Sequence, residues 1–194
     1  MARPLFVQSP YLRVLFGTAC LLALREAVAR WLWDADTDIP VERGSFGVLW
    51  AATTVGTALA VGVPFTGVGS LGAPVLAFWL GIATMLAGFG LRLVAMLALG
   101  EQFSHRVAVK DNHTVVEWGP YRWVRHPSYT GAVVTYLGIG LVTGNAVSLL
   151  AALWGALVGF GHRITVEERA LREQLDDYEN YVERTPYRLI PGVW

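Results

Sequence analysis

Long apolar runs separated by short polar segments dominate the chain. An α-helix needs roughly 20 predominantly apolar residues to cross a bilayer, and several runs approach or exceed that length. The runs cover Tyr11–Trp33, Phe46–Phe65, Pro74–Leu99, Tyr129–Thr143 and Ala146–Gly161. The pattern therefore predicts an all-α integral membrane protein with about five transmembrane helices.

The last two runs are shorter than the others and are separated by Gly144 and Asn145, a turn signal. We expect them to form a helical hairpin from the fourth and fifth spans. The first run carries Arg25, Glu26 and Arg30 near one end, where long side chains can reach the membrane surface. No small-residue cleavage site follows it, so we interpret it as a retained span rather than a signal peptide.

Composition supports a membrane protein. Of the 194 residues, 54% are hydrophobic and 15% are charged, whereas a soluble domain carries about 25% charged residues. The formal net charge of zero gives no reason to expect a nucleic-acid partner. The single cysteine, Cys20, excludes an internal disulfide, and we expect no metal site.

Basic residues predict the topology. Five spans would place residues 34–45, 100–128 and 162–194 on one side, and most of the Lys and Arg residues lie there. The positive-inside rule assigns that side to the cytoplasm. We therefore predict a protein of the inner cell membrane, with its active site and a helical C-terminal segment facing the cytoplasm. We divide it into a three-span region, 1–99, and a catalytic region, 100–194, within a single folding unit.

The stretch "RWVRHPSYTG" lies just before the fourth span. Pro127 is well tolerated in a first helical turn, so Arg125 and His126 would sit at the start of a helix. Free backbone N–H groups and the positive end of the helix dipole meet there, which favours an anionic group such as a carboxylate or phosphate. Simple anchoring of these side chains to lipid headgroups is the alternative.

A second polar stretch, "RITVEERAL", follows the fifth span. We expect an amphipathic helix that continues from this span, with i,i+4 pairs Arg163–Glu167 and Glu168–Arg172. Charges at a membrane boundary facing a polar loop are candidates for a site. Arg92, inside the third run, either snorkels or pairs with a substrate or with Glu167 or Glu168.

The sequence contains one match to a nucleotide-binding motif, which we interpret as a turn. "GVGSLG", residues 67–72, fits G-x-G-x-x-G but lies between two spans. A nucleotide-binding fingerprint needs a preceding strand and a following helix, so we interpret the match as a turn.

Taken in order, "GPYRWVRHPSYTG", "RITVEERAL" and "DDYENYVERTPYRLIP" resemble the isoprenylcysteine carboxyl methyltransferase family. The wider group includes membrane phospholipid methyltransferases. The resemblance covers roughly residues 90 to 192 and indicates a bacterial relative. Leu175 stands where the family often has glycine, so the C-terminal helix is expected to run on unbroken.

The resemblance implies a cofactor, S-adenosylmethionine, with S-adenosylhomocysteine as its product. It assigns substrate and catalytic roles to Arg163 and Glu168. The residues it implies for cofactor binding are Gly119, Pro120, Tyr121, Arg125, His126, Pro127, Tyr129, Gly131 and Glu167. The "TPYRLIPGVW" stretch that follows is expected to be extended rather than helical.

The function that this implies is carboxyl O-methylation of an isoprenylcysteine-like or other small lipophilic molecule at the cytoplasmic membrane interface. The substrate would be a lipophilic small molecule or a lipidated partner that reaches the site from membrane lipid. A carboxylate acceptor needs a cation to orient it, and an amine acceptor needs a base, so the residues permit O- or N-methylation. A phospholipid or amine N-methyltransferase, an NADPH-dependent enzyme resembling sterol reductases, and a non-catalytic membrane scaffold or carrier are the alternatives.

Overall fold

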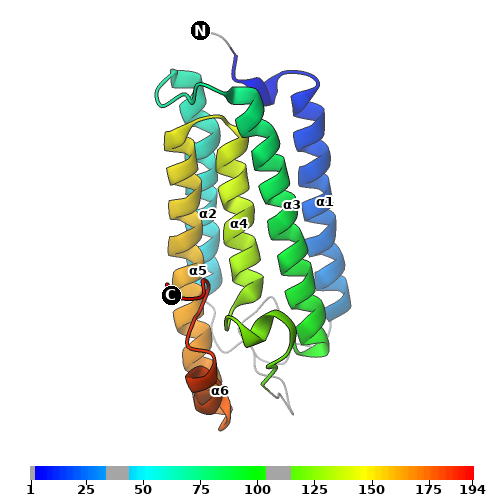
Figure 1. Ribbon diagram of the computed structural model, residues 1–194, viewed down its shortest axis with the longest axis vertical. Helices are drawn as coiled ribbons and strands as arrows, with labels where there is room; N and C mark the ends of the chain where they lie inside the picture. Colours follow the sequence, from blue (N-terminus) through cyan, green and yellow to red (C-terminus); the bar gives the residue numbers. More distant parts are fainter. Residues whose placement is uncertain (1–2, 34–43, 104–114) are drawn as a thin grey trace.

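Long helices lying side by side form the body of the protein (Figure 1). The computed structural model describes residues 3–33, 44–103 and 115–194, and in these ranges it contains helices and turns but no β-strand. The long helices are α1 (Tyr11–Trp33), α2 (Ser45–Gly62), α3 (Pro74–Leu99), α4 (Pro127–Val142) and α5 (Ala146–Gln174). Shorter elements are α6 (Tyr178–Arg184) and the 3₁₀ turns η1 (Leu5–Val7), η2 (Val63–Thr66), η3 (Gly100–Gln102) and η4 (Gly119–Arg122). The predicted all-helical class is confirmed for the described part of the chain.

Helix boundaries follow from local chemistry. Pro127 occupies the first turn of α4, where its missing N–H is not needed. Asn145 caps α5 by accepting a hydrogen bond from the backbone N–H of Ser148 at 3.0 Å. Gly144 has φ +63°, the left-handed conformation that ends a helix at low cost. Residues 143–145 therefore make the tight turn of the predicted hairpin.

α5, the second helix of that hairpin, is the longest of the described helices. α5 has 29 residues, about 43 Å at 1.5 Å per residue, and continues well beyond the expected span end at Gly161. The predicted continuation of the fifth span as one helix is confirmed. Its final turns carry Arg163, Glu167 and Glu168.

The C-terminal helix does not run on unbroken, as Leu175 had led us to expect. α5 ends at Gln174, and Leu175 adopts an extended conformation with φ −127° and ψ 108°. The N–H of Leu175 still bonds to the carbonyl of Leu171, after which the chain turns into α6. Leucine reaches this β-region backbone as easily as glycine would, because φ is negative.

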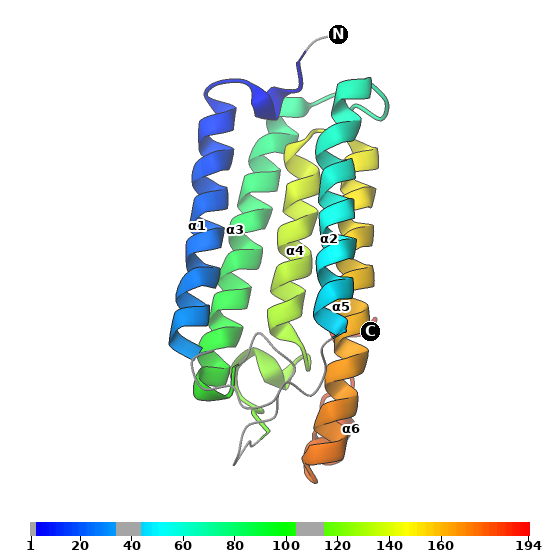
Figure 2. The same ribbon diagram turned by 180° about the vertical axis from the view of Figure 1, so that it is seen from behind.

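Small residues let the helices approach closely, as is common between membrane helices. α3 packs along α4, and α2 along α5 (Figure 2). A Cβ added at Gly88 on α3 would lie 2.5 Å from the carbonyl oxygen of Gly131 on α4. A Cβ added at Gly155 on α5 would lie 2.5 Å from the carbonyl oxygen of Ala52 on α2. Both helix pairs are therefore in backbone contact.

Three helices in the described part of the chain are long and apolar enough to cross a membrane. They are α2 together with η2 (Ser45–Thr66), α3 and α5. α4 has only 16 residues, about 24 Å, and α1 carries several charges. Both lie in the same bundle as the three candidate spans (Figure 1), and the count of five spans stays a prediction.

The two ends of the bundle differ. At one end the α2–α3 and α4–α5 connections are joined by hydrogen bonds: Asn145 Nδ2 to the Val68 carbonyl at 2.5 Å, Ala146 N to the Gly69 carbonyl at 2.9 Å, and Leu71 N to the Gly144 carbonyl at 2.8 Å. The "GVGSLG" segment is thus a turn, as predicted. At the other end, which we call the site end, α1 and α3 finish, α2 and α4 begin, and α6 lies beside the last turns of α5 (Figures 1 and 2).

Candidate active site

The start of α4 is paired with residues that lie sixty positions later in the chain. The N–H of Arg125 donates to the Tyr187 carbonyl, and that of His126 to the Arg188 carbonyl, both at 2.9 Å. The Thr130 hydroxyl, one turn into α4, donates to the Leu189 carbonyl at 2.9 Å. The non-helical segment after α6 therefore runs directly against the Arg-His-Pro element.

A carboxylate lies at the centre of this region. Glu168 Oε1 accepts from Arg125 Nε at 2.9 Å and lies 3.2 Å from His126 Nε2. Glu168 Oε2 accepts from Arg188 Nη2 at 2.8 Å and from Arg188 Nε at 3.1 Å. The Glu168 side chain is only 3% exposed. We call these four residues the Glu168 cluster.

The Glu168 cluster changes the interpretation of the predicted anion seat. The sequence predicts a carboxylate or phosphate beside Arg125 and His126, and the structure places the protein's own Glu168 carboxylate there. Both oxygens of that carboxylate are engaged, and Arg125 also donates from Nη1 to the Thr185 carbonyl at 2.8 Å. A buried carboxylate needs such partners, since an unpaired one is strongly destabilising. The cluster thus joins α5, the start of α4 and the segment after α6.

Tyr129 forms a second group beside the first. Its hydroxyl donates to Glu167 Oε2 at 2.5 Å and accepts from Arg163 Nε at 2.8 Å. Its ring stacks on His126 with a centroid distance of 5.6 Å and an interplanar angle of 9°, and it also packs on Phe160. We call Tyr129, Glu167 and Arg163 the Tyr129 group. Through the His126 ring it is continuous with the Glu168 cluster.

The tyrosines of α6 and η4 close this region. Tyr181 donates from its hydroxyl to the Tyr121 carbonyl at 2.7 Å. The Tyr178 side chain is buried, and its hydroxyl has no hydrogen-bond partner among the described residues. Burial raises the pKa of the Tyr121, Tyr178 and Tyr181 hydroxyls well above 10, so they are neutral at physiological pH. The hydrogen bond to Glu168 raises the pKa of the Arg188 guanidinium, so Arg188 keeps its charge.

Not every residue predicted for cofactor binding faces these groups. Gly119 has φ +62° and, with Pro120, starts the η4 turn that buries Tyr121. Pro127 is fully buried in the first turn of α4. Gly131 faces α3, where an added Cβ would lie 2.6 Å from the backbone nitrogen of Arg92. Glycine at this position therefore serves helix packing.

Two expected ion pairs form with other partners. Arg92 bonds to Glu26 of α1 (Nε to Oε1, 2.9 Å) and to Ser128 of α4 (Nη1 to Oγ, 2.8 Å), rather than to Glu167 or Glu168. Glu168 is engaged in its cluster, and Arg172 pairs with Glu179 of α6 at 2.5 Å, so the expected Glu168–Arg172 pair is wrong. Tertiary partners displaced the local i,i+4 contact because Glu168 faces inward on α5.

Sequence reasoning missed Arg188 and Tyr178. Arg188 lies in the non-helical run "TPYRLIPGVW", which has no periodicity that indicates which side chain turns inward, and Tyr178 starts the short helix α6. Arg188 supplies the guanidinium that the second oxygen of Glu168 requires.

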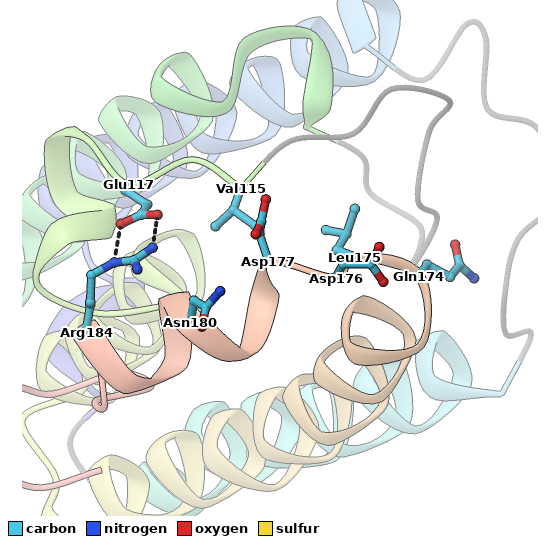
Figure 3. Close-up of a pocket in the computed structure, with 8 residues that line it drawn as sticks. All are labelled: Val115, Glu117, Gln174, Leu175, Asp176, Asp177, Asn180 and Arg184. Carbon is cyan, nitrogen blue, oxygen red and sulfur yellow. Dashed lines mark hydrogen bonds and ion pairs between the residues drawn. The ribbon is translucent and has the colours of Figure 1, made fainter.

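A hollow of about 510 Å³ opens between the end of α5, α6 and the segment before η4 (Figure 3). Its lining is mostly polar and acidic, and the Glu117–Arg184 ion pair lies at one side (Nε to Oε2, 3.0 Å). The lining residues are Val115, Glu117, Gln174, Leu175, Asp176, Asp177, Asn180 and Arg184. None of them belongs to the Glu168 cluster or to the Tyr129 group. Among the described residues no group of three or more His, Cys, Asp or Glu side chains is arranged to hold a metal ion.

The protein is therefore an all-helical membrane protein with a buried Arg-His-Glu cluster at one end of its helix bundle. Residues 79–173 match the family model of the isoprenylcysteine carboxyl methyltransferase (ICMT) family. The matched part, just under half of the chain, contains η4, α4 and nearly all of α5.

Individual relatives give the same result. Fission yeast (Schizosaccharomyces pombe) has a protein named protein-S-isoprenylcysteine O-methyltransferase that is 43% identical over 102 residues, covering 50% of this chain and 42% of the relative. A Dictyostelium discoideum protein of the same name is 32% identical over 119 residues, covering 60% of this chain and 50% of the relative. The chain spans about half the length of these curated relatives.

A solved structure shows that the likeness of fold extends further. The structure described as the eukaryotic intramembrane Ras methyltransferase ICMT matches with a TM-score of 0.66 at 20% identity. It covers 96% of this chain and 69% of that one. Nearly the whole chain therefore shares this fold, including the α1–α2 region that the family model does not reach.

Proposed function

We propose that the protein is an S-adenosylmethionine-dependent methyltransferase that methylates the carboxylate of an isoprenylcysteine-like or other lipophilic molecule. The observation that carries the proposal is the Tyr129 group. It brings a cation, Arg163, and a carboxylate, Glu167, onto one phenol hydroxyl at the site end of the bundle. The names of the relatives that share residues of this region support the same reaction.

The residues present fit the cofactor. Its amino-acid part carries an ammonium and a carboxylate, and its adenine needs aromatic and polar neighbours. The Tyr178 hydroxyl is buried and has no partner within residues 3–33, 44–103 and 115–194, the His126 and Tyr129 rings are stacked, and Glu167 is a carboxylate beside them. Tyr178, His126, Tyr129 and Glu167 would therefore hold the group. When bound, S-adenosylmethionine supplies an electrophilic methyl group.

The charge of the methyl acceptor determines which side chains the reaction needs. A carboxylate is already ionised at neutral pH, so it attacks without a general base and needs only a cation to orient it. Arg163, only 3% exposed and fixed by the Tyr129 hydroxyl, fits that role. Glu168 holds Arg125, His126 and Arg188 in place, and these fix the start of α4. An amine acceptor would first have to lose a proton. Glu167, which shares the Tyr129 hydroxyl with Arg163, is the carboxylate that would accept it.

The location of these residues suits a reaction between two phases. The polar groups gather where α4 begins and where α5 leaves its apolar stretch, while the apolar faces of α2 and α3 are exposed along the bundle. A water-soluble cofactor then arrives from the site end and a lipophilic acceptor from the bilayer. We propose that the site end faces the cytoplasm of the inner cell membrane and that α1 and α4 complete five spans.

The experiment is transfer of a labelled methyl group from S-adenosylmethionine to an S-farnesyl-N-acetylcysteine by the purified protein in lipid nanodiscs. We expect a base-labile methyl ester, and an Arg163→Gln variant should lose at least about tenfold in kcat/KM. Arg172→Gln, with a solvent-facing arginine on the same helix, is the matched control and should retain activity. Labelled amine products from membrane extract would indicate N-methylation instead. No S-adenosylmethionine binding together with a thermal shift in NADPH would refute the proposal in favour of a reductase.

A further inference from the structure

A buried arginine on α1 has hydrogen-bond donors that the protein does not use. Arg25 has a side chain only 10% exposed, and Nη2 forms its ion pair with the neighbouring Glu26. Its Nε and Nη1 atoms are buried and have no hydrogen-bond partner among the described residues. Buried charged donors are normally satisfied, so two such atoms on one guanidinium point to a missing partner.

The neighbours of Arg25 do not supply that partner. Its guanidinium lies 5.0 Å from the centroid of the Phe89 ring on α3, a contact that uses the π-face and leaves the N–H groups free. Arg92, three residues further along α3, bonds to the same Glu26 and to Ser128 through its Nε, Nη1 and Nη2 atoms. Within the described part of the chain, two guanidinium groups therefore share the Glu26 carboxylate.

The surroundings limit what can approach. Leu21, Leu24 and Val28 on the same helix are exposed on the bundle surface, whereas Leu22 is partly buried. Arg25 lies eight residues before the end of α1, about 12 Å along the helix. A small inorganic anion has no reason to reach an apolar surface at that depth. An anion attached to a hydrocarbon chain does, since its chain lies in lipid while its head meets the arginine.

We propose that Arg25 binds the anionic head of an amphiphile, a carboxylate or a phosphate, between α1 and α3. Nη2 already pairs with Glu26, and the unused Nε and Nη1 lie on opposite edges of the guanidinium, so each can donate a single charge-assisted hydrogen bond to an oxygen of the carboxylate or phosphate. Phe89 supports its face, and the flexible side chain reaches the head by a change of rotamer. The Arg92–Ser128 contact then connects the occupied site to the start of α4. The proposal does not depend on methyl transfer.

The experiment measures binding of two amphiphiles that differ only in charge. S-farnesyl-N-acetylcysteine and its methyl ester are titrated against the full chain in phosphatidylcholine nanodiscs. We expect the acid to bind at least about tenfold more tightly than the ester. In an Arg163→Gln background, which removes the cation assigned to the acceptor carboxylate, Arg25→Gln should abolish that preference and Arg25→Lys should restore part of it. Arg13→Gln, an exposed arginine on the same helix, should leave it unchanged.

The outcomes separate the possible sources of the anion. Displacement of the acid by phosphatidylglycerol supports the site and adds lipid phosphate to its ligands, while failure to displace it supports the site and restricts it to carboxylates. Equal affinity of the unmodified protein for acid and ester overturns the proposal, whether or not the Arg25→Gln variant folds. So does a preference that survives in a folded variant carrying both Arg25→Gln and Arg163→Gln. If the unmodified protein prefers the acid but forms no methyl ester, the Arg25 site is supported and only the proposed methyl transfer is refuted.

Discussion

Arg188 and Glu168 form a two-pronged ion pair in which the guanidinium Nη2 and Nε lie 2.8 and 3.1 Å from one carboxylate oxygen. The pair joins the non-helical segment after α6 to the inward face of α5. Because the other Glu168 oxygen is bound by Arg125 and His126, three separate parts of the chain meet at one carboxylate.

Removing the Arg188 guanidinium should destabilise the fold. In Arg188→Gln, a buried carboxylate loses two hydrogen bonds but keeps Arg125 and His126. We expect a loss of about 1–2 kcal/mol, at the low end for a charged hydrogen bond because the arginine is one-third exposed. Unfolding in detergent, followed by circular dichroism against denaturant, measures it. Arg184→Gln breaks the exposed pair with Glu117 and should change little. Equal effects of the two variants would contradict the central role of Glu168.

The Tyr129 hydroxyl should matter more for activity than for stability. Tyr129→Phe keeps the ring on His126 but separates Glu167 from Arg163, so both lose the group that aligns them. We expect kcat/KM for methyl transfer to fall by about 10- to 100-fold, equivalent to about 1.4–2.8 kcal/mol. Tyr136→Phe, two turns further along α4, is the control and should be near normal. Full activity in Tyr129→Phe would remove the Tyr129 group from the mechanism.

Close packing of α3 on α4 gives a prediction about stability alone. In Gly88→Ala the new methyl group would lie 2.5 Å from the Gly131 carbonyl oxygen, so the helices must separate. Overpacking of this kind costs about 1–3 kcal/mol. Gly90→Ala on the same helix meets nothing within 4 Å and should be neutral or slightly stabilising. The thermal midpoints of the two variants in the same detergent compare them, and similar midpoints would argue against backbone contact here.

Alkaline pH should unfold the protein through its buried tyrosines. Burial raises the pKa of the Tyr121, Tyr178 and Tyr181 hydroxyls in the folded state, so these groups favour folding at pH values below the unfolded pKa of about 10. Above pH 10 the unfolded chain loses these protons first, and stability falls. Tyrosinate absorbance should therefore rise together with loss of helical signal. Ionisation of all tyrosines while the helices stay intact would contradict this.

The apolar pattern predicted most of the fold because burial in lipid or between helices leaves a direct record in the sequence. α1 and α3 have the predicted limits, and Gly144 and Asn145 form the predicted turn. The end of α5 at Leu175 was not predictable in the same way. That break depends on α6 packing back against the site end, which is a tertiary preference rather than a local one.

The sequence named most of the residues of the candidate site but not which side chains would contact one another. The family resemblance assigned Arg125, His126, Glu167 and Glu168 to one cofactor and substrate site, and the structure brings these side chains to the same end of the bundle. The sequence did not indicate that Glu168 would occupy the seat beside Arg125, or that Arg188 would complete it. Local i,i+4 rules describe an isolated helix, and here the buried face of α5 selects partners from other segments.

The hydrogen bonds that tie the α2–α3 turn to the α4–α5 turn have a mechanical consequence. With Asn145 bonded to the Val68 carbonyl and Ala146 to the Gly69 carbonyl, the helices are fastened together at the end remote from the site. Any parting of the helices that admits a hydrocarbon chain therefore pivots about this fastened end. At the site end α3, α4 and α5 are joined through side chains, Arg92 with Ser128 and Glu168 with Arg125, so a lipophilic molecule that enters there has to displace side-chain contacts and not the bonded turns.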